Sequence, residues 1–489
     1  MNRRTAETLG LSEKGWLETA QKVVYEGKAI HSTEAERSKG GREYGAGEGK
    51  FPKRKTQSLQ QRRLMAVEQV STIQRMKVHS LIDKVYKLSN LHLAWKKVKE
   101  NKGAGGIDAV NVEGFDSIAE SELEKLHREL RTDSYAPMPV RRVQIPKRGK
   151  PKEMRPLGIP AIRDRVCQQA LKNRLEPIFE PVFNECSFGY RPGRSAHDAL
   201  RKIWRELTEG YQWVVDADLR DYFGSVDHEK LITMVSERIS DGRVLKLIRQ
   251  MLKAGYVENG KQLPTPQGTP QGGVISPLLS NIYLTPFDNE MTRRGHKLTR
   301  FADDWLVLCR TRAEAQQALK EATETLKELG LRLHPEKTRI AHITWGFEFL
   351  GYKLKRGKRL KLSESKLSKK PNAQGMYAVP KEQSIRRFME QIRLKTKRKV
   401  PLTLKEIIEE INPIIRGWGM YYRKAHVRKL FSRLKGWIVH RLWSHQLKRW
   451  RNCGWRKYPD RVLYNHYGLV NLTQLIPDIG GRSERKAIS

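Results

Sequence analysis

Apolar residues recur at helical spacing in several stretches of this chain, and short apolar runs separate those stretches. From about residue 64, apolar positions three and four apart predict a helix that ends at the glycine-rich run 103–108. Residues 136–160 are proline-rich and are predicted to be extended, and the periodicity of 162–179 predicts a second helix. One face of the first helix is predicted to carry Leu81, Val85, Leu88, Leu91 and Trp95.

The middle third of the chain alternates predicted strands with predicted helices. The β-branched run 213–219 is typical of a buried strand, and 228–239 has helical periodicity. Residues 298–310 are predicted to form two strands around a tight turn, and the helix that follows ends at Gly330. Strands return over 331–343. The order strand, helix, hairpin, helix, strand predicts an α/β sandwich with helices on one face of the sheet.

The two ends of the chain differ from this middle region. Residues 1–63 are polar and rich in glycine and charge, which is typical of a weakly ordered extension. Residues 391–489 are strongly basic, and the helical spacing of apolar positions over 428–450 predicts a separate helical domain. We expect Trp437 to pack inside that domain, because it is spaced with Leu434 and Ile438. The basic region contains five tryptophans: Trp418, Trp437, Trp443, Trp450 and Trp455.

The composition narrows the classes of function. Hydrophobic residues make up 38% of the chain and charged residues 30%, which predicts a soluble globular protein. No apolar run approaches the roughly 18 residues that span a bilayer, so we expect no membrane partner. Lys and Arg number 95 against 54 Asp and Glu, and the net charge of +41 is spread along the whole chain. A charge of this distribution indicates a partner with a phosphate backbone.

The four cysteines are far apart in the chain and none belongs to a closely spaced pair. This spacing argues against disulfides and against a zinc site, and it favours reduced thiols in a reducing compartment. The cysteines are Cys167, Cys186, Cys309 and Cys453.

Adjacent carboxylates stand at the predicted turn of the hairpin. Asp303 and Asp304 repel each other, so holding both at a tight turn is costly unless a cation lies beside them. An exposed Asp-Asp hairpin turn is the alternative. Asp218 closes the strand 213–219, where it either faces this turn or caps a turn of its own. Three carboxylates on neighbouring strand ends can hold two Mg²⁺ ions about 4 Å apart for in-line phosphoryl transfer.

Three further segments carry candidate ligand contacts. Phe223, five residues after Asp218, lies either beneath the sugar of a nucleotide or in the core. In the glycine-rich run 268–273, the glycines let the backbone approach a ligand, and Gln271 suits a contact to a base or sugar. Ser276 is predicted to cap a helix after this run. The third segment is an extended basic stretch that either grips a triphosphate or is a solvated loop: Lys147, Arg148, Lys150, Lys152 and Arg155.

These segments, taken in order, resemble the sequence blocks of group II intron reverse transcriptases. The matching blocks lie within about residues 80–355, and GWGMYYR at 417–423 extends the likeness to about residue 470. The blocks include RPLGIPAIRDRV, VVDADLRDYFGSVDH, TPQGTPQGGVISPLLSNIYL, RFADDWLVLC, HPEKT and FEFLGYKL.

The resemblance implies an α+β right-hand polymerase with fingers, a palm built on an antiparallel RRM-like sheet, and an α-helical thumb or maturase domain. The polar N-terminal extension 1–63 would precede these domains, and a basic C-terminal tail would follow them. The expected boundaries are 64–210 for the fingers, 211–384 for the palm, 385–470 for the thumb and 471–489 for the tail.

The resemblance also implies roles for single residues. Asp218, Asp303 and Asp304 would be the catalytic ligands of two Mg²⁺ ions, for which Mn²⁺ can substitute. Lys337 would protonate the leaving pyrophosphate. Nucleotide contacts would come from Lys147, Arg155, Phe223, Gln271 and Gly272. The primer-gripping turn would consist of Leu350, Gly351 and Tyr352. Contacts to intron RNA would come from Arg416, Trp418, Tyr421, Tyr422 and Arg423.

Two departures from the family pattern bear on activity. Phe301 stands where the family usually has Tyr, which keeps the ring and should not abolish catalysis. Many relatives add a zinc-supported HNH endonuclease with paired cysteines, and nothing after Tyr467 supplies those residues. We therefore expect no DNA cleavage, so that priming would use other ends, such as a nascent strand at a replication fork.

The expected function is that of an RNA-directed DNA polymerase that copies intron RNA into DNA. The expected partners are group II intron RNA, an RNA template with a DNA primer, target DNA and deoxynucleotides. The protein would also assist splicing and retrohoming, in the bacterial cytoplasm and at the nucleoid. Two alternatives remain open: a reverse transcriptase repurposed for host defence or DNA repair, and a splicing cofactor with little polymerase activity. The intact carboxylates and Phe223 argue against the latter.

Overall fold

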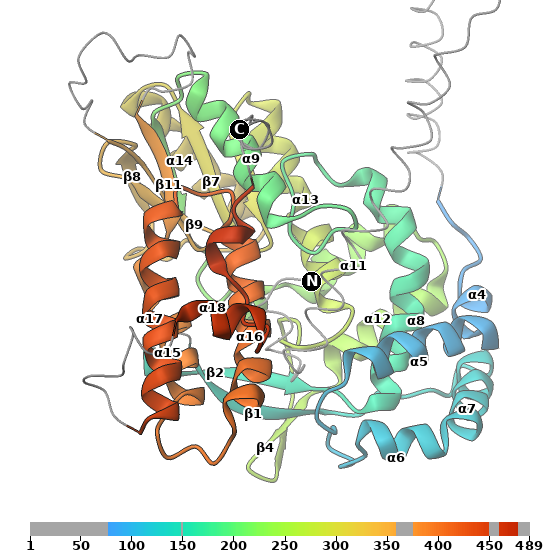
Figure 1. Cartoon of the computed structure of the whole chain (residues 1–489). Helices are drawn as coiled ribbons and strands as arrows, with labels where there is room; N and C mark the ends of the chain where they lie inside the picture. Colours follow the sequence, from blue (N-terminus) through green and yellow to red (C-terminus); the bar gives the residue numbers. More distant parts are fainter. Residues whose placement is uncertain (1–76, 148–149, 358–374, 449–458, 478–489) are drawn as a thin grey trace, which may run out of the picture.

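The structure is a computed structural model, and it describes residues 77–147, 150–357, 375–448 and 459–477 (Figure 1). The expected N-terminal extension 1–63 and most of the expected C-terminal tail lie outside these residues. Within the described ranges, no helix combines the length and the apolar character needed to cross a membrane.

The fingers region is a group of helices joined to a long hairpin. Its helices are α4 (Ile82–Tyr86), α5 (Leu88–Asn101), α6 (Val112–Ser117), α7 (Ala119–Arg131), α8 (Ile162–Phe179) and α9 (Ala196–Thr208), with the 3₁₀ turn η1 (Glu180–Val182) after α8. The hairpin pairs β1 (Val140–Lys147) with β2 (Lys150–Ile159) in antiparallel register. Helix α8 occupies the range that the periodicity predicted.

The expected single helix over the first apolar stretch is wrong, because the chain breaks into α4 and α5 at Lys87. Lys87 has φ −52° and ψ 126°, outside the helical region. The Asn90 side chain donates hydrogen bonds to the carbonyls of Val85 (2.9 Å) and Ala170 (3.0 Å), and so it satisfies the open end of α4. The expected apolar positions still pack into one core, with Leu88 at its margin.

The palm sheet has the strand order β6-β7-β3-β8, and all its pairings are antiparallel. Helices α13 and α14 cover one face, as the pattern predicted. The other face is also covered, by α9 and by the thumb, with which it shares a second core. The strands are β3 (Trp213–Ala217), β6 (Lys297–Phe301), β7 (Asp304–Cys309) and β8 (Arg339–His342), so the expected strands over 331–343 shrink to one.

Shorter elements surround this sheet. The helices are α10 (Tyr222–Ser225), α11 (His228–Ser236), α12 (Gly242–Lys253), α13 (Ser276–Arg293) and α14 (Arg312–Glu328). The small strands β4 (Tyr256–Glu258) and β5 (Lys261–Leu263) extend the β1–β2 hairpin, where β4 runs parallel to β1. A third sheet has the order β11-β10-β9, built from β9 (Phe347–Phe349), β10 (Tyr352–Arg356) and β11 (Met376–Pro380).

The thumb is helical, as predicted, and packs on the palm rather than standing apart. Its elements are α15 (Glu382–Lys395), α16 (Leu404–Tyr422), α17 (Arg428–Gln446), α18 (Asp460–Asn465) and the 3₁₀ turn η3 (Leu472–Leu475). One continuous apolar core joins the faces of these helices to the palm sheet and to the third sheet. Figure 1 shows the blue and cyan fingers helices on one side of the molecule and the orange and red thumb helices on the other.

Candidate functional site

The end of strand β3 and the β6–β7 hairpin bring three carboxylates to one end of the palm sheet. Ala217 pairs with Trp305, so Asp218 follows at the strand end next to Asp304. Because side chains alternate along a strand, Asp218 and Asp304 point to the same face. Phe301 pairs with Asp304 across a two-residue turn of Ala302 and Asp303. The sheet therefore gathers the end of β3 and the Asp-Asp turn, as the sequence predicted.

Lys337 contacts this group directly. Its Nζ forms an ion pair with the Asp218 carboxylate, and the Lys337 side chain is 57% exposed. The turn that carries it is attached to the same residue, since the His334 N–H donates to the Asp218 carbonyl at 2.8 Å. The structure thus joins Asp218 and Lys337, which are 119 positions apart in the chain.

The carboxylates have the donor chemistry for a divalent cation, but they are not arranged as a closed set of ligands. In the part of the chain that the structure describes, no three His, Cys, Asp or Glu side chains form a group that could hold a metal ion. The Asp218 carboxylate forms an ion pair with the Lys337 ammonium. Carboxylate oxygens are the hard ligands that Mg²⁺ takes. The residues present therefore fit Mg²⁺ in donor type.

Asp216 is a fourth carboxylate that the sequence argument did not single out. It points to the same face of β3 as Asp218, and it forms an ion pair with Arg339 (2.9 Å). Burial raises the pKa of Asp216 and the nearby Asp304 carboxylate raises it further, while Arg339 opposes both effects. Its position two residues before Asp218 in a strand was the available signal.

Phe223 lies in the short helix α10, directly after β3. Its ring is partly buried against the core, 5.2 Å from the ring centroid of Tyr222. The Phe223 carbonyl accepts a hydrogen bond from the Thr269 N–H at 2.7 Å. Gly268 lies so close that an added Cβ would be 2.7 Å from the same carbonyl oxygen. The glycine-rich loop is therefore packed directly on the Phe223 turn.

The other end of this loop packs on the fingers hairpin. The Gln271 carbonyl accepts from the Gly158 N–H in β2 at 2.7 Å. Gly272 has φ +118°, and a Cβ there would lie 2.4 Å from the Gly158 oxygen, which explains the need for glycine. Arg155 lies three positions earlier in β2 and is partly buried. The loop 268–273 thus links the Phe223 turn to the strand of Arg155.

The prediction that Ser276 caps a helix needs correction, and the predicted role of Lys147 concerns a side chain outside the described residues. Ile275 occupies the N-cap position of α13, and Ser276 begins the helix, with Pro277 in its first turn as expected. The Ser276 hydroxyl donates instead to the Pro270 carbonyl at 2.9 Å and so holds the loop. Lys147 ends β1, but its side chain lies outside the described residues, so its expected triphosphate contact stays a prediction.

The predicted primer turn is a two-residue hairpin between β9 and β10. Phe349 pairs with Tyr352, and both turn residues have positive φ, 47° at Leu350 and 80° at Gly351. A type I′ turn requires this combination. The Tyr421 hydroxyl donates to the Leu350 carbonyl (2.7 Å). The Tyr422 hydroxyl donates to the Gly351 carbonyl (3.0 Å), so the end of α16 holds this turn.

The aromatic residues expected to contact RNA are engaged in these protein contacts. Trp418 is buried, stacks on Phe388 with ring centroids 4.5 Å apart, and donates to the Ser384 hydroxyl at 3.1 Å. Tyr422 is also buried. The geometry supports a packing role for these two rings. Of the remaining expected residues, Arg416 is exposed and Arg423 is half-buried, so a contact with RNA stays a prediction for them.

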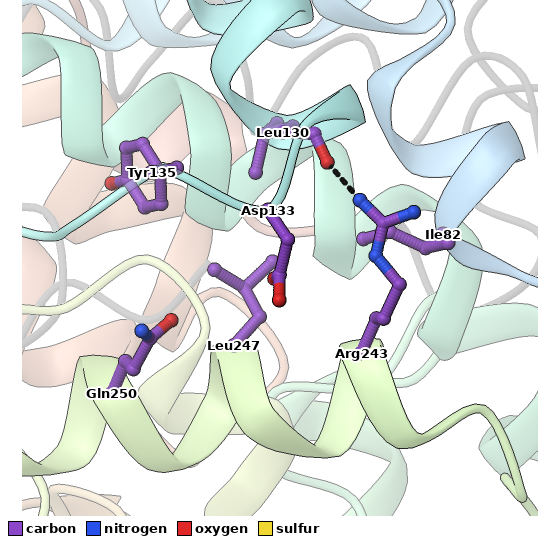
Figure 2. A pocket seen from close by; sticks show the side chains of 7 residues that line it. All are labelled: Ile82, Leu130, Asp133, Tyr135, Arg243, Leu247 and Gln250. Atoms are coloured by element: carbon purple, nitrogen blue, oxygen red, sulfur yellow. Dashed lines mark hydrogen bonds between the residues drawn. The ribbon is translucent and has the colours of Figure 1, made fainter.

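The pocket in Figure 2 lies apart from these residues, among α4, α7 and α12. Arg243 there donates to the Leu130 carbonyl at 2.5 Å, and Asp133 forms an ion pair with Lys246 at 2.6 Å. None of the predicted site residues lines this pocket, so it is not part of the candidate site. Its lining residues are Ile82, Leu130, Asp133, Tyr135, Arg243, Leu247 and Gln250.

Comparison with known proteins identifies two families that match this chain. Residues 145–354 match the family described as "Reverse transcriptase (RNA-dependent DNA polymerase)". Residues 385–463 match the family "Group II intron, maturase-specific domain". The matched reverse transcriptase region, the antiparallel sheets and the helical C-terminal region confirm a right-hand polymerase fold of the reverse transcriptase class.

Two curated relatives narrow the class. Protein YkfC from Escherichia coli (strain K12) is 38% identical over 55% of this chain and 80% of that protein. Group II intron-encoded protein LtrA from Lactococcus lactis subsp. cremoris is 31% identical over 68% of each chain. The chain therefore belongs to the family of group II intron-encoded reverse transcriptases with a maturase domain. It is an RNA-directed DNA polymerase, hence a nucleotidyltransferase, with a maturase role in splicing.

A likeness to a solved structure adds nothing to this assignment. The "Partial Cas6-RT-Cas1--Cas2 complex" has a TM-score of 0.34 and 26% sequence identity, and the match covers 51% of this chain and 42% of that chain.

Proposed function

We propose that Asp218, Asp303 and Asp304 hold two Mg²⁺ ions, for which Mn²⁺ can substitute, and that these ions serve the addition of deoxynucleotides to a DNA primer on an RNA template. The observation that carries the proposal is the β3–β7 register, which sets Asp218 beside Asp304 at the end of the sheet. Bound divalent ions would supply positive charge that favours the ionised 3′-hydroxyl and the pyrophosphate leaving group.

Lys337 carries the proton for the leaving group in this proposal. Its ammonium nitrogen lies against the Asp218 carboxylate, so a proton donor is held beside the carboxylates on an exposed side chain. A positioned donor of this kind contributes to the rate by giving its proton as the leaving oxygen gains charge.

The nucleotide would lie against the loop 268–273. Phe223 beneath this loop would exclude a ribose 2′-hydroxyl, and Gln271 and Gly272 would present backbone to the base and sugar. Arg155, with Lys147, would bind the triphosphate. The support is the direct packing of the loop on both the Phe223 turn and β2.

The RNA partner would be a group II intron RNA, as the printed name of LtrA and the maturase match suggest. The net charge of +41 supports phosphate contacts, and Arg416 and Arg423 on α16 and at its end are candidates for them. Copying this RNA at a target DNA would serve retrohoming, in the bacterial cytoplasm and at the nucleoid.

Primer extension on an RNA template tests the proposal. Purified protein should extend a DNA primer with deoxynucleotides when Mg²⁺ or Mn²⁺ is present, and Asp304→Asn should lose extension while it still binds RNA. Equal extension by Asp304→Asn and the unaltered protein would refute the metal-ligand assignment.

Sugar selectivity gives a separate test of the nucleotide site. Phe223→Ala should incorporate ribonucleotides about 10- to 100-fold more readily relative to deoxynucleotides, because the clash worth about 1–3 kcal/mol is gone. The selectivity ratio is measured from kcat/KM for each nucleotide. An unchanged ratio would remove Phe223 from the site and leave the metal proposal standing.

A further inference from the structure

Arg300 is a completely buried cation in β6, two residues before the Asp-Asp turn. Its side chain and that of Asp288 on α13 are both 0% exposed. Arg300 Nε and Nη2 donate to the two Asp288 carboxylate oxygens at 2.7 and 2.5 Å. Its Nη1 donates to the Asn281 side-chain oxygen and to the Ala302 carbonyl, both at 3.0 Å. One guanidinium therefore connects α13 to the first residue of the turn.

The Ala302 carbonyl belongs to the peptide bond that joins Ala302 to Asp303. Fixing this oxygen fixes the plane of that peptide, and with it the backbone from which the Asp303 side chain leaves. Ala302 has φ +60°, a left-handed backbone conformation that is unfavourable for residues other than glycine. The surrounding contacts must hold the turn in this conformation, and the Arg300 bond is one of them.

Ala302 has a second contact, with Gly189 in the chain segment before α9. A Cβ added to Gly189 would be 2.2 Å from the Ala302 nitrogen, so the two backbones touch. Asn281 donates to the Gly189 carbonyl at 2.9 Å while it accepts from Arg300. Arg300, Asp288, Asn281, Gly189 and Ala302, the Arg300 cluster from here on, thus form one connected group of contacts.

Stability alone does not explain such a cluster. Removing two charges from water costs about as much as their attraction returns, and well-packed apolar residues would stabilise the core equally. What an apolar pair could not provide is a directional hydrogen bond to the Ala302 oxygen.

We propose that Arg300 and Asn281 are positioning residues of the polymerase reaction. They hold the Ala302–Asp303 peptide so that the carboxylates of Asp303 and Asp304 stay in place beside Asp218. The inference rests on the metal-ligand assignment under Proposed function and deepens it, because it assigns the support of that site to residues that contact neither metal nor substrate.

The test replaces the buried ion pair without leaving a lone charge. Arg300→Met/Asp288→Leu keeps an apolar core but removes the bond to Ala302. We expect kcat for primer extension to fall about 10- to 100-fold, the effect of losing the residues that orient metal ligands, with less than about threefold change in the KM for primer–template. Direct Mn²⁺ binding, measured by electron paramagnetic resonance of the free ion, should weaken about tenfold or more.

A second ion pair, with side chains 19% and 5% exposed, controls for the loss of a largely buried ion pair next to β6. Lys202 and Glu206 on α9 also pack on β6 and form an ion pair at 2.8 Å, but Lys202 donates to the Leu298 carbonyl, away from the turn. The double variant Lys202→Met/Glu206→Leu should keep the kcat and Mn²⁺ affinity of the unaltered protein.

Each outcome decides the inference. A folded Arg300→Met/Asp288→Leu protein with unaltered kcat and Mn²⁺ binding overturns it, as does an equal loss in the Lys202→Met/Glu206→Leu control. If the Arg300 double variant does not fold, Asn281→Ala decides: weakened Mn²⁺ binding supports the inference, and unchanged binding overturns it. Asp303→Asn, run in parallel, separates the two proposals, because its full activity would refute the metal site itself.

Discussion

Two hairpin turns of the palm are held in different ways. The Ala302–Asp303 turn, which carries the candidate catalytic carboxylates, is held by Arg300 in the palm and by the Gly189 backbone of the fingers region. The Leu350–Gly351 turn, the candidate primer contact, is held by hydroxyls of α16 in the thumb. Both turns contain residues with positive φ. The hydrogen bonds and backbone contacts named for the first turn come from the palm and fingers, whereas the hydroxyls that hold the second turn come from the thumb.

We therefore expect that a substitution can disturb one turn and leave the other in place. A change in the thumb should alter how the primer is bound but leave the carboxylates in place. A change at the carboxylates should stop the chemistry but leave the thumb contacts intact. Further hydrogen bonds tie the second turn to the thumb: Tyr352, the residue after the turn, and His197 on α9 both hydrogen-bond the carbonyl of Tyr421 in α16.

The largest effect is expected from Asp303→Ala. Losing a carboxylate that neutralises charge in phosphoryl transfer should cost several kcal/mol, a loss of about 10³-fold in kcat. Primer–template affinity, measured by fluorescence anisotropy, should change by less than about threefold because the primer turn is untouched. A loss of affinity as large as the loss in kcat would show that the turns are coupled.

Gly351→Ala should give the next largest effect. A Cβ there would lie 2.7 Å from the Tyr422 hydroxyl oxygen, so the Tyr422 side chain must move away from the turn and its hydrogen bond to the Gly351 carbonyl is disturbed. The left-handed backbone adds about 1–2 kcal/mol of destabilisation, and the primer–template KM should rise about tenfold while kcat stays within about threefold.

Gly330→Ala is the matched control for backbone strain. Gly330 has φ +78°, close to that of Gly351, and a Cβ there meets nothing within 4 Å. It should lower the free energy of unfolding by a similar amount but leave the primer–template KM unchanged. An equal rise in KM in both variants would assign the effect to stability and not to the primer turn.

A smaller effect is expected from Tyr421→Phe, which removes the bond to the Leu350 carbonyl. One such bond is worth about 1 kcal/mol, so the primer–template KM should rise no more than about fivefold. Tyr377→Phe in β11 removes a hydroxyl outside this network and should leave the KM unchanged. Steady-state extension at varied primer–template concentration measures both, and identical KM values for the two variants would count against the thumb contact.

The smallest effect should come from Arg416→Ala, on the exposed side of α16. Removing one phosphate contact should weaken RNA binding about two- to threefold and lower the slope of log affinity against log salt by about one. Neither kcat nor the primer–template KM should change. A slope equal to that of the unaltered protein would place the RNA contact elsewhere on the surface.

The sequence predicted the elements of the palm better than the contacts between regions. Asp218, Asp303 and Asp304 were predictable because β-branched runs and a short turn place them at strand ends by local rules. The break at Lys87 was not, because it depends on the Asn90 amide reaching the Val85 carbonyl. The apolar positions before and after Lys87 keep the same helical spacing whether or not the helix breaks there.

The roles of Arg300 and Tyr422 depend on partners in other elements of the fold. An arginine in a strand is usually exposed. Arg300 can be buried because Asp288, on helix α13, forms an ion pair with it. An aromatic residue in a basic segment suggests contact with RNA, but the Tyr422 hydroxyl bonds the Gly351 carbonyl, 71 positions earlier in the chain. Local pattern carries no information on such pairings.

The most direct measurement compares primer extension by Asp218→Asn and Asp216→Asn. Both variants remove one carboxylate charge from the same face of β3, and both lose an ion pair, with Lys337 and with Arg339 respectively. If Asp218 acts together with the Asp303–Asp304 turn, Asp218→Asn loses about 10³-fold in kcat, and Asp216→Asn stays within about tenfold of the unaltered protein. Full extension by Asp218→Asn would contradict the account.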